Sequence, residues 1–372
     1  MAIALLGGLD AATFLRRHWQ KRPLLVRQAL PRFRGLATPA ELRRLAARDD
    51  VESRLVARAN GRWRVAGGPF PATTWRRAPA RNWTLLVQGL DLHQQGAHEL
   101  LAAFTFIPYA RLDDVMASHA VPGGGVGPHF DSYDVFLLQG SGRRRWRISA
   151  QRDLELTPGA PLKILRRFVP EQEWVLEPGD LLYLPPRYAH EGTALTECTT
   201  YSIGFRAPAY QELACEFLAF LQDRIELPGG YADPDLAPQR HPARIPAPML
   251  ARFAAALDKV RWTRRDVAEF AGRFLSEPKP AVVFDPPPRP LSEARFRAAA
   301  ERGGVALDRR SRMLTSGSRV YINGEALAAG GESLHLLQRL ADRRRLPPGR
   351  LPAGAAVPLY PWYRAGYIHL CG

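Results

Sequence analysis

Lysine is scarce in this chain. Of its 52 basic residues, four are lysines and the other 48 are arginines. The formal net charge of +16 would by itself suggest a surface that binds nucleic acid. However, the arginine runs at 143–145, 309–310 and 343–345 are scattered along the chain rather than gathered in one tail. An arginine-rich genome explains such a composition as well as a binding surface does, so we do not expect direct nucleic-acid binding.

Cysteine is also rare, and long apolar runs are missing. Cys198, Cys215 and Cys371 show no CxxC spacing, which argues against a disulfide framework and favours a reducing compartment. No stretch of 18 apolar residues occurs, so no membrane span is expected. The first ten residues lack the basic start of a signal peptide. We therefore expect a cytoplasmic protein.

The 372 residues exceed what one hydrophobic core usually organises. We predict three regions: a mainly β domain at 1–208, a helical region at 209–283, and a third unit at 284–372 that begins with the linker FDPPPRP. The third unit combines a helix, strands around an Asn323-Gly324 turn, and a second helix. This order is typical of a small winged-helix module.

The central part of the chain consists of short apolar segments separated by turns. The stretch 121–149 combines a glycine-rich loop, a strand, a Gly-Ser-Gly turn and a second strand. The stretches 173–192 and 198–208 continue this pattern. Many short strands at this spacing predict a β-sandwich or a barrel. After position 208 the apolar residues recur with a helical period instead.

A candidate metal site lies in this β-rich part. Within a strand, His129 and Asp131 would project from the same face, and His190 follows a separate β segment. Two histidines and one carboxylate on one side of a metal are typical of non-haem Fe(II) oxygenases. A bare HxD pattern is weak and could mark a surface or packing histidine. The glycine-rich loop before it and the apolar segment after it favour the metal site.

The run GRRRW at 142–146 offers a possible anchor for an anion. Residues alternate between the two faces of a strand, so Arg144 points away from the side that its two arginine neighbours occupy. An inward Arg144 could bind the far carboxylate of 2-oxoglutarate with two parallel hydrogen bonds. The alternative is a solvated basic turn, and the residues alone leave both possibilities open.

Four segments of the chain resemble those of a known family. They are FLRRHWQKRPLLV, VPGGGVGPHFDSYDVFLLQGSGRRRWRIS, EPGDLLYLPPRYAHEG and YSIGFRAP. In these segments the chain resembles the Jumonji-C ribosomal oxygenases, and most of all the bacterial branch that hydroxylates an arginine of large-subunit ribosomal protein sixteen. The resemblance runs through essentially the whole chain. It implies a double-stranded β-helix (cupin) core, a helical dimerisation region that makes a homodimer, and a C-terminal winged-helix domain.

The resemblance also implies roles for individual residues. His129, Asp131 and His190 would bind the iron, and Arg144 would bind 2-oxoglutarate. Ser118 and Thr200 would add polar contacts to 2-oxoglutarate, although Thr200 stands where close relatives are expected to carry asparagine.

The same resemblance implies how an arginine substrate is recognised. Asp114 would bind the guanidinium group, and the ring of Tyr133 would contact the aliphatic stem. Asp114 could instead be a turn residue within RLDDV. Asp134 should face away from the His129–Asp131 side, which favours a structural role. Among the remaining histidines, His119 is the most plausible exception to a purely structural role.

These expectations together describe an Fe(II)- and 2-oxoglutarate-dependent enzyme that uses dioxygen for 3-hydroxylation of an arginine in a large-subunit ribosomal protein. The same chemistry on a histidine of another ribosomal protein, or on a modified RNA base, is an alternative. A second alternative is a non-catalytic, metal-binding cupin that acts as a ribosome-associated factor. An intact set of metal ligands together with Arg144 argues against this second alternative, because a pure binding module needs neither.

Overall fold

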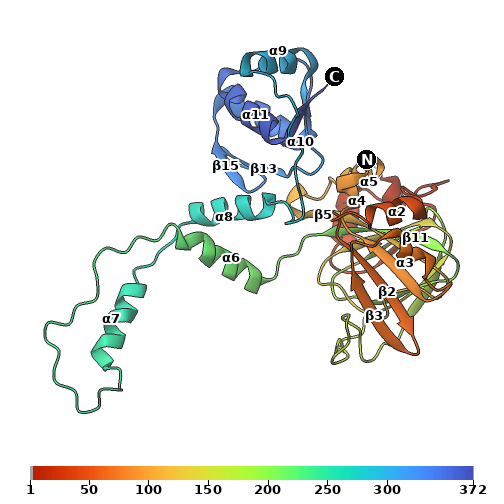
Figure 1. The fold of residues 1–372 in the computed structure, drawn as a ribbon, viewed down its shortest axis with the longest axis horizontal. Coiled ribbons are helices and arrows are strands. Elements are labelled where there is room, and N and C mark those ends of the chain that lie inside the picture. The colour runs from red at the N-terminus through yellow and green to blue at the C-terminus, as the bar shows by residue number, and fades with distance from the viewer. Residues whose placement is uncertain (1–2, 372) are drawn as a thin grey trace.

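The computed structural model describes residues 3–371, which form a β-rich N-terminal body, an extended helical arm and a compact C-terminal unit (Figure 1). The β-rich body extends to Phe205 at the end of β11. The arm contains α6 (Tyr210–Gln222), α7 (Ala247–Leu257) and α8 (Arg264–Ser276). Within the described part of the chain, no helix is both long and apolar enough to cross a lipid bilayer.

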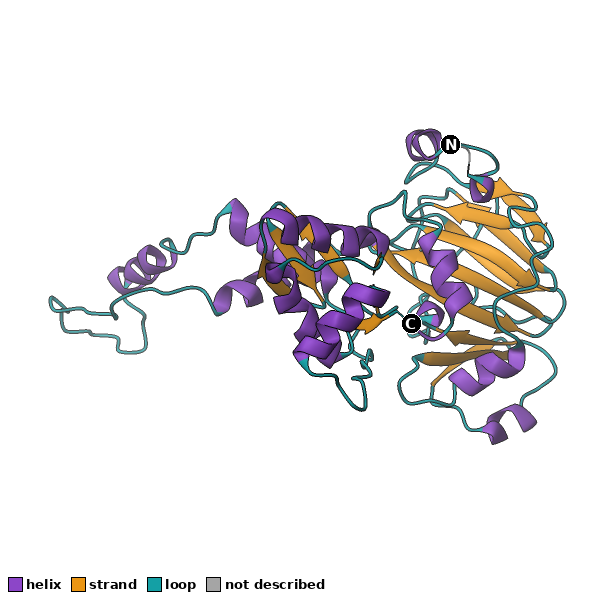
Figure 2. Cartoon of the chain, turned by 90° about the horizontal axis from the view of Figure 1, so that it is seen from above, coloured by secondary structure: helices purple, strands orange, loops and turns teal. Residues whose placement is uncertain are grey.

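Two antiparallel sheets build the N-terminal body (Figure 2). In the described residues, the larger sheet has the strand order β1-β9-β6-β11-β5-β4-β2-β3 and the smaller sheet has the order β10-β7-β8. The strands of the larger sheet are β1 (Leu24–Val26), β2 (Ser53–Ala59), β3 (Arg62–Gly67), β4 (Trp83–Val87), β5 (Leu112–Ala120), β6 (Val135–Ser141), β9 (Leu181–Leu184) and β11 (Cys198–Phe205). Those of the smaller sheet are β7 (Arg144–Ser149), β8 (Gln172–Leu176) and β10 (Ala189–Ala194).

The central strand β6 shows how the two sheets and the helices are held together. Its residues alternate between the two faces of the sheet. Val135 and Leu137 pack with Trp146 of β7 in one core cluster, which holds the sheets face to face. Phe136 packs on the opposite side against Phe14, with ring centroids 5.5 Å apart. The predicted sandwich or barrel is thus confirmed, with one face of the larger sheet covered by helices.

Short helices cover the outer face of the larger sheet. They are η1 (Ala4–Leu6), α1 (Ala11–Arg17), α2 (Pro39–Leu45), α3 (Ala72–Arg76), α4 (Leu90–His93), α5 (Gln95–Ala102) and η2 (Tyr109–Arg111). Helix α2 begins with a capping box: the Glu41 N–H donates to Thr38 Oγ1 (3.3 Å), and the Thr38 N–H donates to Glu41 Oε2 (2.7 Å). These reciprocal bonds explain why so short a helix starts at a defined residue.

The C-terminal unit has a hydrophobic core of its own. Its elements are α9 (Glu293–Gly303), β12 (Val305–Leu307), β13 (Met313–Ser316), β14 (Arg319–Ile322), β15 (Glu325–Ala328), α10 (Gly331–Arg343), β16 (Arg345–Leu346), α11 (Ala353–Ala365) and β17 (Ile368–Leu370). The predicted turn joins β14 to β15, where Asn323 and Gly324 both have positive φ (50° and 86°). Helix α8 lies against both this unit and α6, through Gly272 on Tyr321 and through Phe270 on Phe217.

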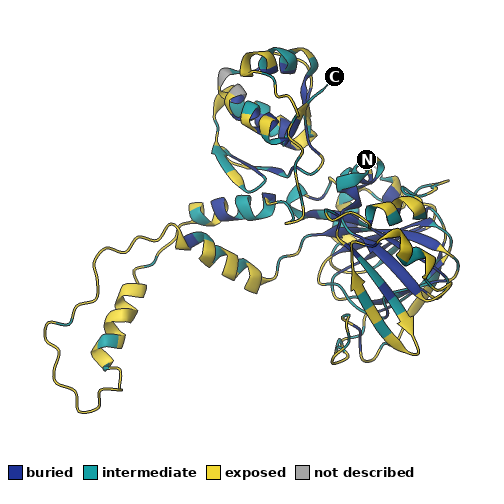
Figure 3. Cartoon of the chain, in the orientation of Figure 1, coloured by how far each residue is buried: buried dark blue, intermediate teal, exposed yellow. Residues whose placement is uncertain are grey.

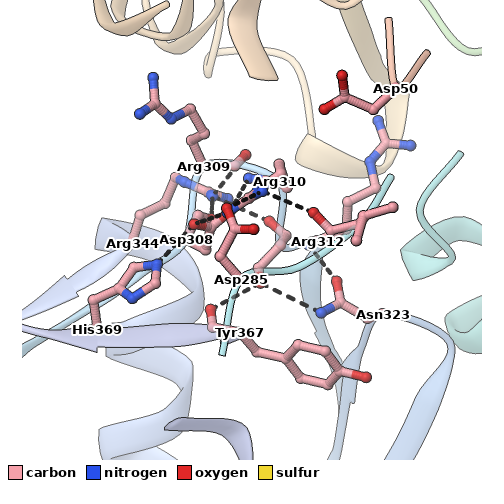
Figure 4. A network of polar contacts seen from close by, with 12 residues as sticks. Asp50, Asp285, Asp308, Arg309, Arg310, Arg312, Asn323, Arg344, Tyr367 and His369 are labelled. Atoms are coloured by element: carbon pink, nitrogen blue, oxygen red, sulfur yellow. Dashed lines mark hydrogen bonds and ion pairs between the residues drawn. The ribbon is translucent and has the colours of Figure 1, made fainter. Parts of the chain in front are cut away.

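A network of polar contacts in the C-terminal unit includes Arg312 (Figure 4), and Arg312 ties this unit to the start of β5. Arg310 donates to Asp308 Oδ1 (2.7 Å) and to Asp285 Oδ2 (2.8 Å). Arg312 Nη2 donates to the carbonyl oxygens of Leu112 (2.6 Å) and Asp113 (3.2 Å). Because these acceptors belong to the first residues of β5, docking of the C-terminal unit restrains that end of the strand.

A buried carboxyl lies beside the same end of β5. Asp91 in α4 is almost fully buried and accepts the N–H of Val115 (2.8 Å) at Oδ1. Burial raises the pKa of Asp91 from 3.8 to about 7, with a further contribution from the charge of the neighbouring Asp114. The folded protein therefore holds a proton on Asp91 over a pH range in which the unfolded chain does not.

We expect Asp91→Asn to remove a pH-dependent loss of stability. Because the folded pKa is the higher one, the contribution of Asp91 to stability is fully present below about pH 3.8 and is lost as the pH rises through about 7. A rise of three pKa units corresponds to an upper limit of ~4 kcal/mol. Asparagine can keep the bond from Val115 without carrying a charge. Urea unfolding of both proteins at pH 6 and pH 8 tests this: the variant should be the more stable at pH 8, and equal pH dependence would contradict the prediction.

Candidate active site

A cavity of about 800 Å³ opens between the two sheets. Seven of the eight side chains singled out from the sequence line it: Asp114, Ser118, His129, Asp131, Tyr133, Arg144 and His190. They come from β5, β7, β10 and the segment that precedes β6. The cavity therefore collects residues that are up to 76 positions apart in the chain (114 to 190).

His129, Asp131 and His190 converge at one point of this cavity. Each offers a ligand atom, and these atoms all lie within 4.8 Å of one another. His190 Nε2 is 3.6 Å from Asp131 Oδ2, and the two imidazole centroids are 4.2 Å apart. The prediction that both residues of the HxD pair lie on a strand is wrong in detail. His129 forms an isolated bridge with His190, and Asp131 lies in the irregular segment before β6.

Backbone carbonyls determine which nitrogen of each histidine faces its neighbours. His129 Nδ1 lies 2.9 Å from the carbonyl of Gly127, and His190 Nδ1 lies 2.9 Å from that of Tyr188. A carbonyl can only accept, so both Nδ1 atoms are protonated and donate, which leaves the Nε2 lone pairs for a metal. Burial, helped by His129, lowers the pKa of His190 to about 4. Two imidazoles and a carboxylate are a donor set that fits Fe(II).

Arg144 confirms the predicted alternation along β7. It is 4% exposed, whereas Arg143 is exposed and Arg145 is half-buried. Its Nη1 donates to Ser118 Oγ (3.1 Å), but its Nε and Nη2 have no hydrogen-bond partner among the described residues. A buried guanidinium with two unsatisfied nitrogens is costly unless an anion binds there. The cavity wall thus fits a carboxylate ligand at Arg144.

Thr200 does not share this position. Its hydroxyl donates to Gln139 Oε1 (2.9 Å), and the residue does not line the cavity. We therefore see no geometric support for a direct contact with a cosubstrate, in contrast to Ser118. His119 is fully buried against the ring of Trp83, and burial lowers its pKa to about 4. The structure thus gives His119 the environment of a core residue.

Asp114 and Tyr133 lie on the cavity side of their segments. Asp114 is 4% exposed, and Tyr133 is 41% exposed. Three donors converge on Asp114 Oδ2: Lys279 Nζ (2.9 Å), the Gly89 N–H (3.1 Å) and Gln88 Nε2 (3.2 Å). Sequence reasoning missed the contact with Lys279, because nothing in the chain links positions 165 residues apart.

Asp134 faces away from the cavity, as the alternation predicts. It accepts hydrogen bonds from Tyr183 Oη (2.6 Å), Gln20 Nε2 (3.0 Å) and Arg111 Nη2 (3.3 Å). These contacts join the N-terminal segment to the larger sheet. Asp131 and Asp134, three positions apart in the chain, thus have different roles because they face opposite sides of the segment.

Comparison with known proteins agrees with this geometry. Residues 99–213 match the JmjC domain family, and residues 259–367 match the ROXA-like winged helix. The chain is 37% identical over 324 residues to the ribosomal protein uL16 3-hydroxylase of Escherichia coli, a match that covers 86% of each protein. It is 39% identical over 228 residues to a probable ribosomal oxygenase of Haemophilus influenzae, covering 60% of this chain and 54% of that protein.

A solved structure of similar fold contains 2-oxoglutarate together with a divalent-metal element, cobalt, in place of iron. It is the E. coli ribosomal oxygenase YcfD in complex with cobalt and 2-oxoglutarate, with a TM-score of 0.82 and 33% identity over 97% of this chain and 98% of that one. The fold and the site thus define a Jumonji-C oxygenase with a cupin core, which uses Fe(II), 2-oxoglutarate and dioxygen. More narrowly, the chain belongs to the family of ribosomal oxygenases. The predicted family, cupin core and winged-helix domain are confirmed.

Proposed function

We propose that this oxygenase adds one oxygen atom to the β-carbon of an arginine in ribosomal protein uL16, and that it does so in the cytoplasm, where it meets this client. The observation that carries the proposal is one cavity holding three convergent metal ligands, a buried arginine with unsatisfied nitrogens, and a buried carboxylate. The name of the E. coli relative, a uL16 3-hydroxylase, supports the choice of client.

In this proposal, His129, Asp131 and His190 hold the iron. Arg144 binds the far carboxylate of 2-oxoglutarate through its two unpartnered nitrogens, and Ser118, which also lines the cavity, accepts a hydrogen bond from Arg144 and adds a polar contact. When bound, Fe(II) and 2-oxoglutarate together allow dioxygen to hydroxylate a C–H bond while 2-oxoglutarate is converted to succinate and carbon dioxide.

The remaining residues would position the substrate. Asp114 binds the guanidinium of the target arginine, since a carboxylate in a site shielded from water forms strong, charge-assisted bonds with that group. The exposed ring of Tyr133 at the cavity edge contacts the aliphatic stem. Anchoring the far end of the side chain determines which carbon lies next to the metal ligands, which is how position selects one C–H bond among several. A histidine side chain in the substrate would form a weaker contact with a buried carboxylate than an arginine side chain does.

The first experiment combines the protein with Fe(II), ascorbate, 2-oxoglutarate and a uL16 loop peptide that carries its target arginine. We expect a gain of one oxygen on the arginine by mass spectrometry, with succinate formed in parallel. Asp131→Ala should abolish both products, whereas Asp49→Ala, which removes an exposed carboxyl, should change neither. Succinate without an oxidised peptide would point to another client, and iron binding without succinate would favour a non-catalytic cupin.

Arg144→Met tests the anchor for 2-oxoglutarate. At one hundred times its dissociation constant a ligand stabilises a protein by ~2.7 kcal/mol, and we expect this stabilisation to be lost in the variant. The ligand-free variant should be at least as stable as the parent, because an unpaired buried charge has been removed. Thermal unfolding with and without 2-oxoglutarate, in the presence of Mn²⁺, measures both effects. The exposed neighbour gives the control Arg143→Met, and a 2-oxoglutarate shift that persists in Arg144→Met would contradict the assignment.

We further propose that residues 209–283 form a dimerisation region between an oxygenase domain at 1–208 and a winged-helix domain at 284–372. Helix α7 extends away from both compact units, and no residue of it is buried (Figures 1 and 3). Leu250 and Leu257 lie seven positions apart on one face of this helix and are 53% and 67% exposed. Apolar residues arranged in this way are typical of a surface that packs against a second copy of the chain.

Leu250→Asp combined with Leu257→Asp should therefore convert a dimer into a monomer, because two charges would be buried in the contact. Light scattering after size-exclusion chromatography measures the mass directly. Arg252→Asp, an equally exposed change within the same helix, is the matched control and should leave the dimer intact. A parent protein that is monomeric at micromolar concentration would overturn the proposal.

A further inference from the structure

Lys279 lies outside the oxygenase domain, at a position from which it contacts Asp114, the carboxylate that is proposed to bind the substrate. It follows α8, between Pro278 and Pro280, whose rings restrict the backbone on both sides. Its ammonium lies 2.9 Å from Asp114 Oδ2 and 3.3 Å from Asp113 Oδ2. Figure 1 shows the end of α8 beside β5, the strand that carries both aspartates. The chain after the helical arm therefore reaches the wall of the active site.

The hydrogen bonds of Asp114 are distributed unequally over its two oxygens. Oδ2 accepts from Lys279, from the Gly89 N–H and from Gln88. No donor to Oδ1 occurs among the described residues, and a Cβ added at Gly204, which also lines the cavity, would lie 3.7 Å from Oδ1. One oxygen of the carboxylate is thus fixed from behind, and the other remains available to a ligand in the cavity.

Charge explains why this carboxylate needs a cation of the protein. Asp91, Asp113 and Asp114 lie close together, and burial raises the pKa of Asp114. Lys279 opposes that rise, and its own pKa is raised by the two neighbouring carboxylates. Arg206 pairs with the side chain of Asp113 (3.8 Å), whereas Arg312 donates to backbone carbonyls and feels the charges of these carboxylates without forming an ion pair with Asp114. Among the described residues, Lys279 is the one cation that forms an ion pair with Asp114.

We propose that Lys279 is a positioning residue for substrate recognition: it pairs with Asp114 Oδ2 and orients this carboxylate so that Oδ1 binds the cationic side chain of the substrate. The inference rests on the proposed arginine hydroxylation. It assigns a task in catalysis to the segment between α8 and the winged helix, which contributes no metal ligand and no 2-oxoglutarate contact. Arg312 supports this arrangement by restraining the backbone of residues 112 and 113.

The test compares Lys279→Met with the parent on two peptides, one with the target arginine and one with citrulline, its neutral analogue, at that position. We expect KM for the arginine peptide to rise roughly tenfold or more, because a charge-assisted contact is lost. The preference of kcat/KM for arginine over citrulline should fall by a similar factor. KM for 2-oxoglutarate should not change, since Arg144 and the metal ligands are untouched.

Three further variants separate positioning from general damage. Lys279→Arg keeps the positive charge and should retain most of the arginine preference. Lys259→Met removes an exposed lysine and should behave like the parent. In an Asp114→Asn background, adding Lys279→Met should cause no further loss, because coupled residues do not act additively.

The possible failures are distinct. An unchanged arginine preference in Lys279→Met, with an active parent, would overturn the role of Lys279 alone. An equal loss on both peptides, or a changed KM for 2-oxoglutarate, would also overturn it, because either result indicates disruption of the whole site. A parent that forms succinate but never oxidises the arginine peptide would overturn the proposed function and this inference with it.

Discussion

The site depends first on two backbone hydrogen bonds between His129 and His190. Each residue donates its N–H to the carbonyl of the other, at 2.9 and 2.8 Å. This antiparallel pair is isolated, since β6, the strand that follows Asp131 in the chain, does not begin until Val135. It nevertheless brings residues 61 positions apart into register, and the carbonyls of Gly127 and Tyr188 then orient both rings. A metal site built from side chains alone would lack this restraint on the backbone.

The cavity around this bridge contains charges that a protein interior normally excludes. Arg144 is buried with two unsatisfied nitrogens, and Asp114 is buried beside other carboxylates. Arg144 and Asp114 have different hydrogen-bond partners. Arg144 donates to one neutral group, the Ser118 hydroxyl, whereas Asp114 accepts from the Lys279 ammonium and from two further donors. In the proposed site a cosubstrate anion completes the first arrangement. In the second, the protein's own cation would hold the carboxylate in place before any substrate arrives, which reduces the reorganisation needed on binding.

Local patterns predicted much of this molecule because they depend on neighbours in the chain. The alternation in GRRRW placed Arg144 inward, the HxD spacing indicated two of the three side chains that converge in the cavity and could hold a metal, and Asn323-Gly324 marked a hairpin. Contacts between distant segments were not predictable in the same way. The bond from Thr200 to Gln139 and the ion pair of Lys279 with Asp114 depend on how strands and domains pack. The irregular path at Asp131 was also missed, since an apolar strand follows directly and suggests a continuous one.

The position of Lys279 bears on why a winged-helix unit accompanies an oxygenase. The proposed metal ligands and Arg144 lie on β7, on β10 and on the segment that precedes β6, so in this proposal binding of iron and 2-oxoglutarate needs no later part of the chain. Asp114, the carboxylate that is proposed to bind the substrate, differs. Its counter-ion, Lys279, follows α8, and Arg312 of the C-terminal unit holds the backbone beside it. Loosening that unit would therefore weaken recognition of the client before it affected the redox centre. In this way the C-terminal unit, which has no residue in the cavity lining, can influence which substrate the enzyme binds.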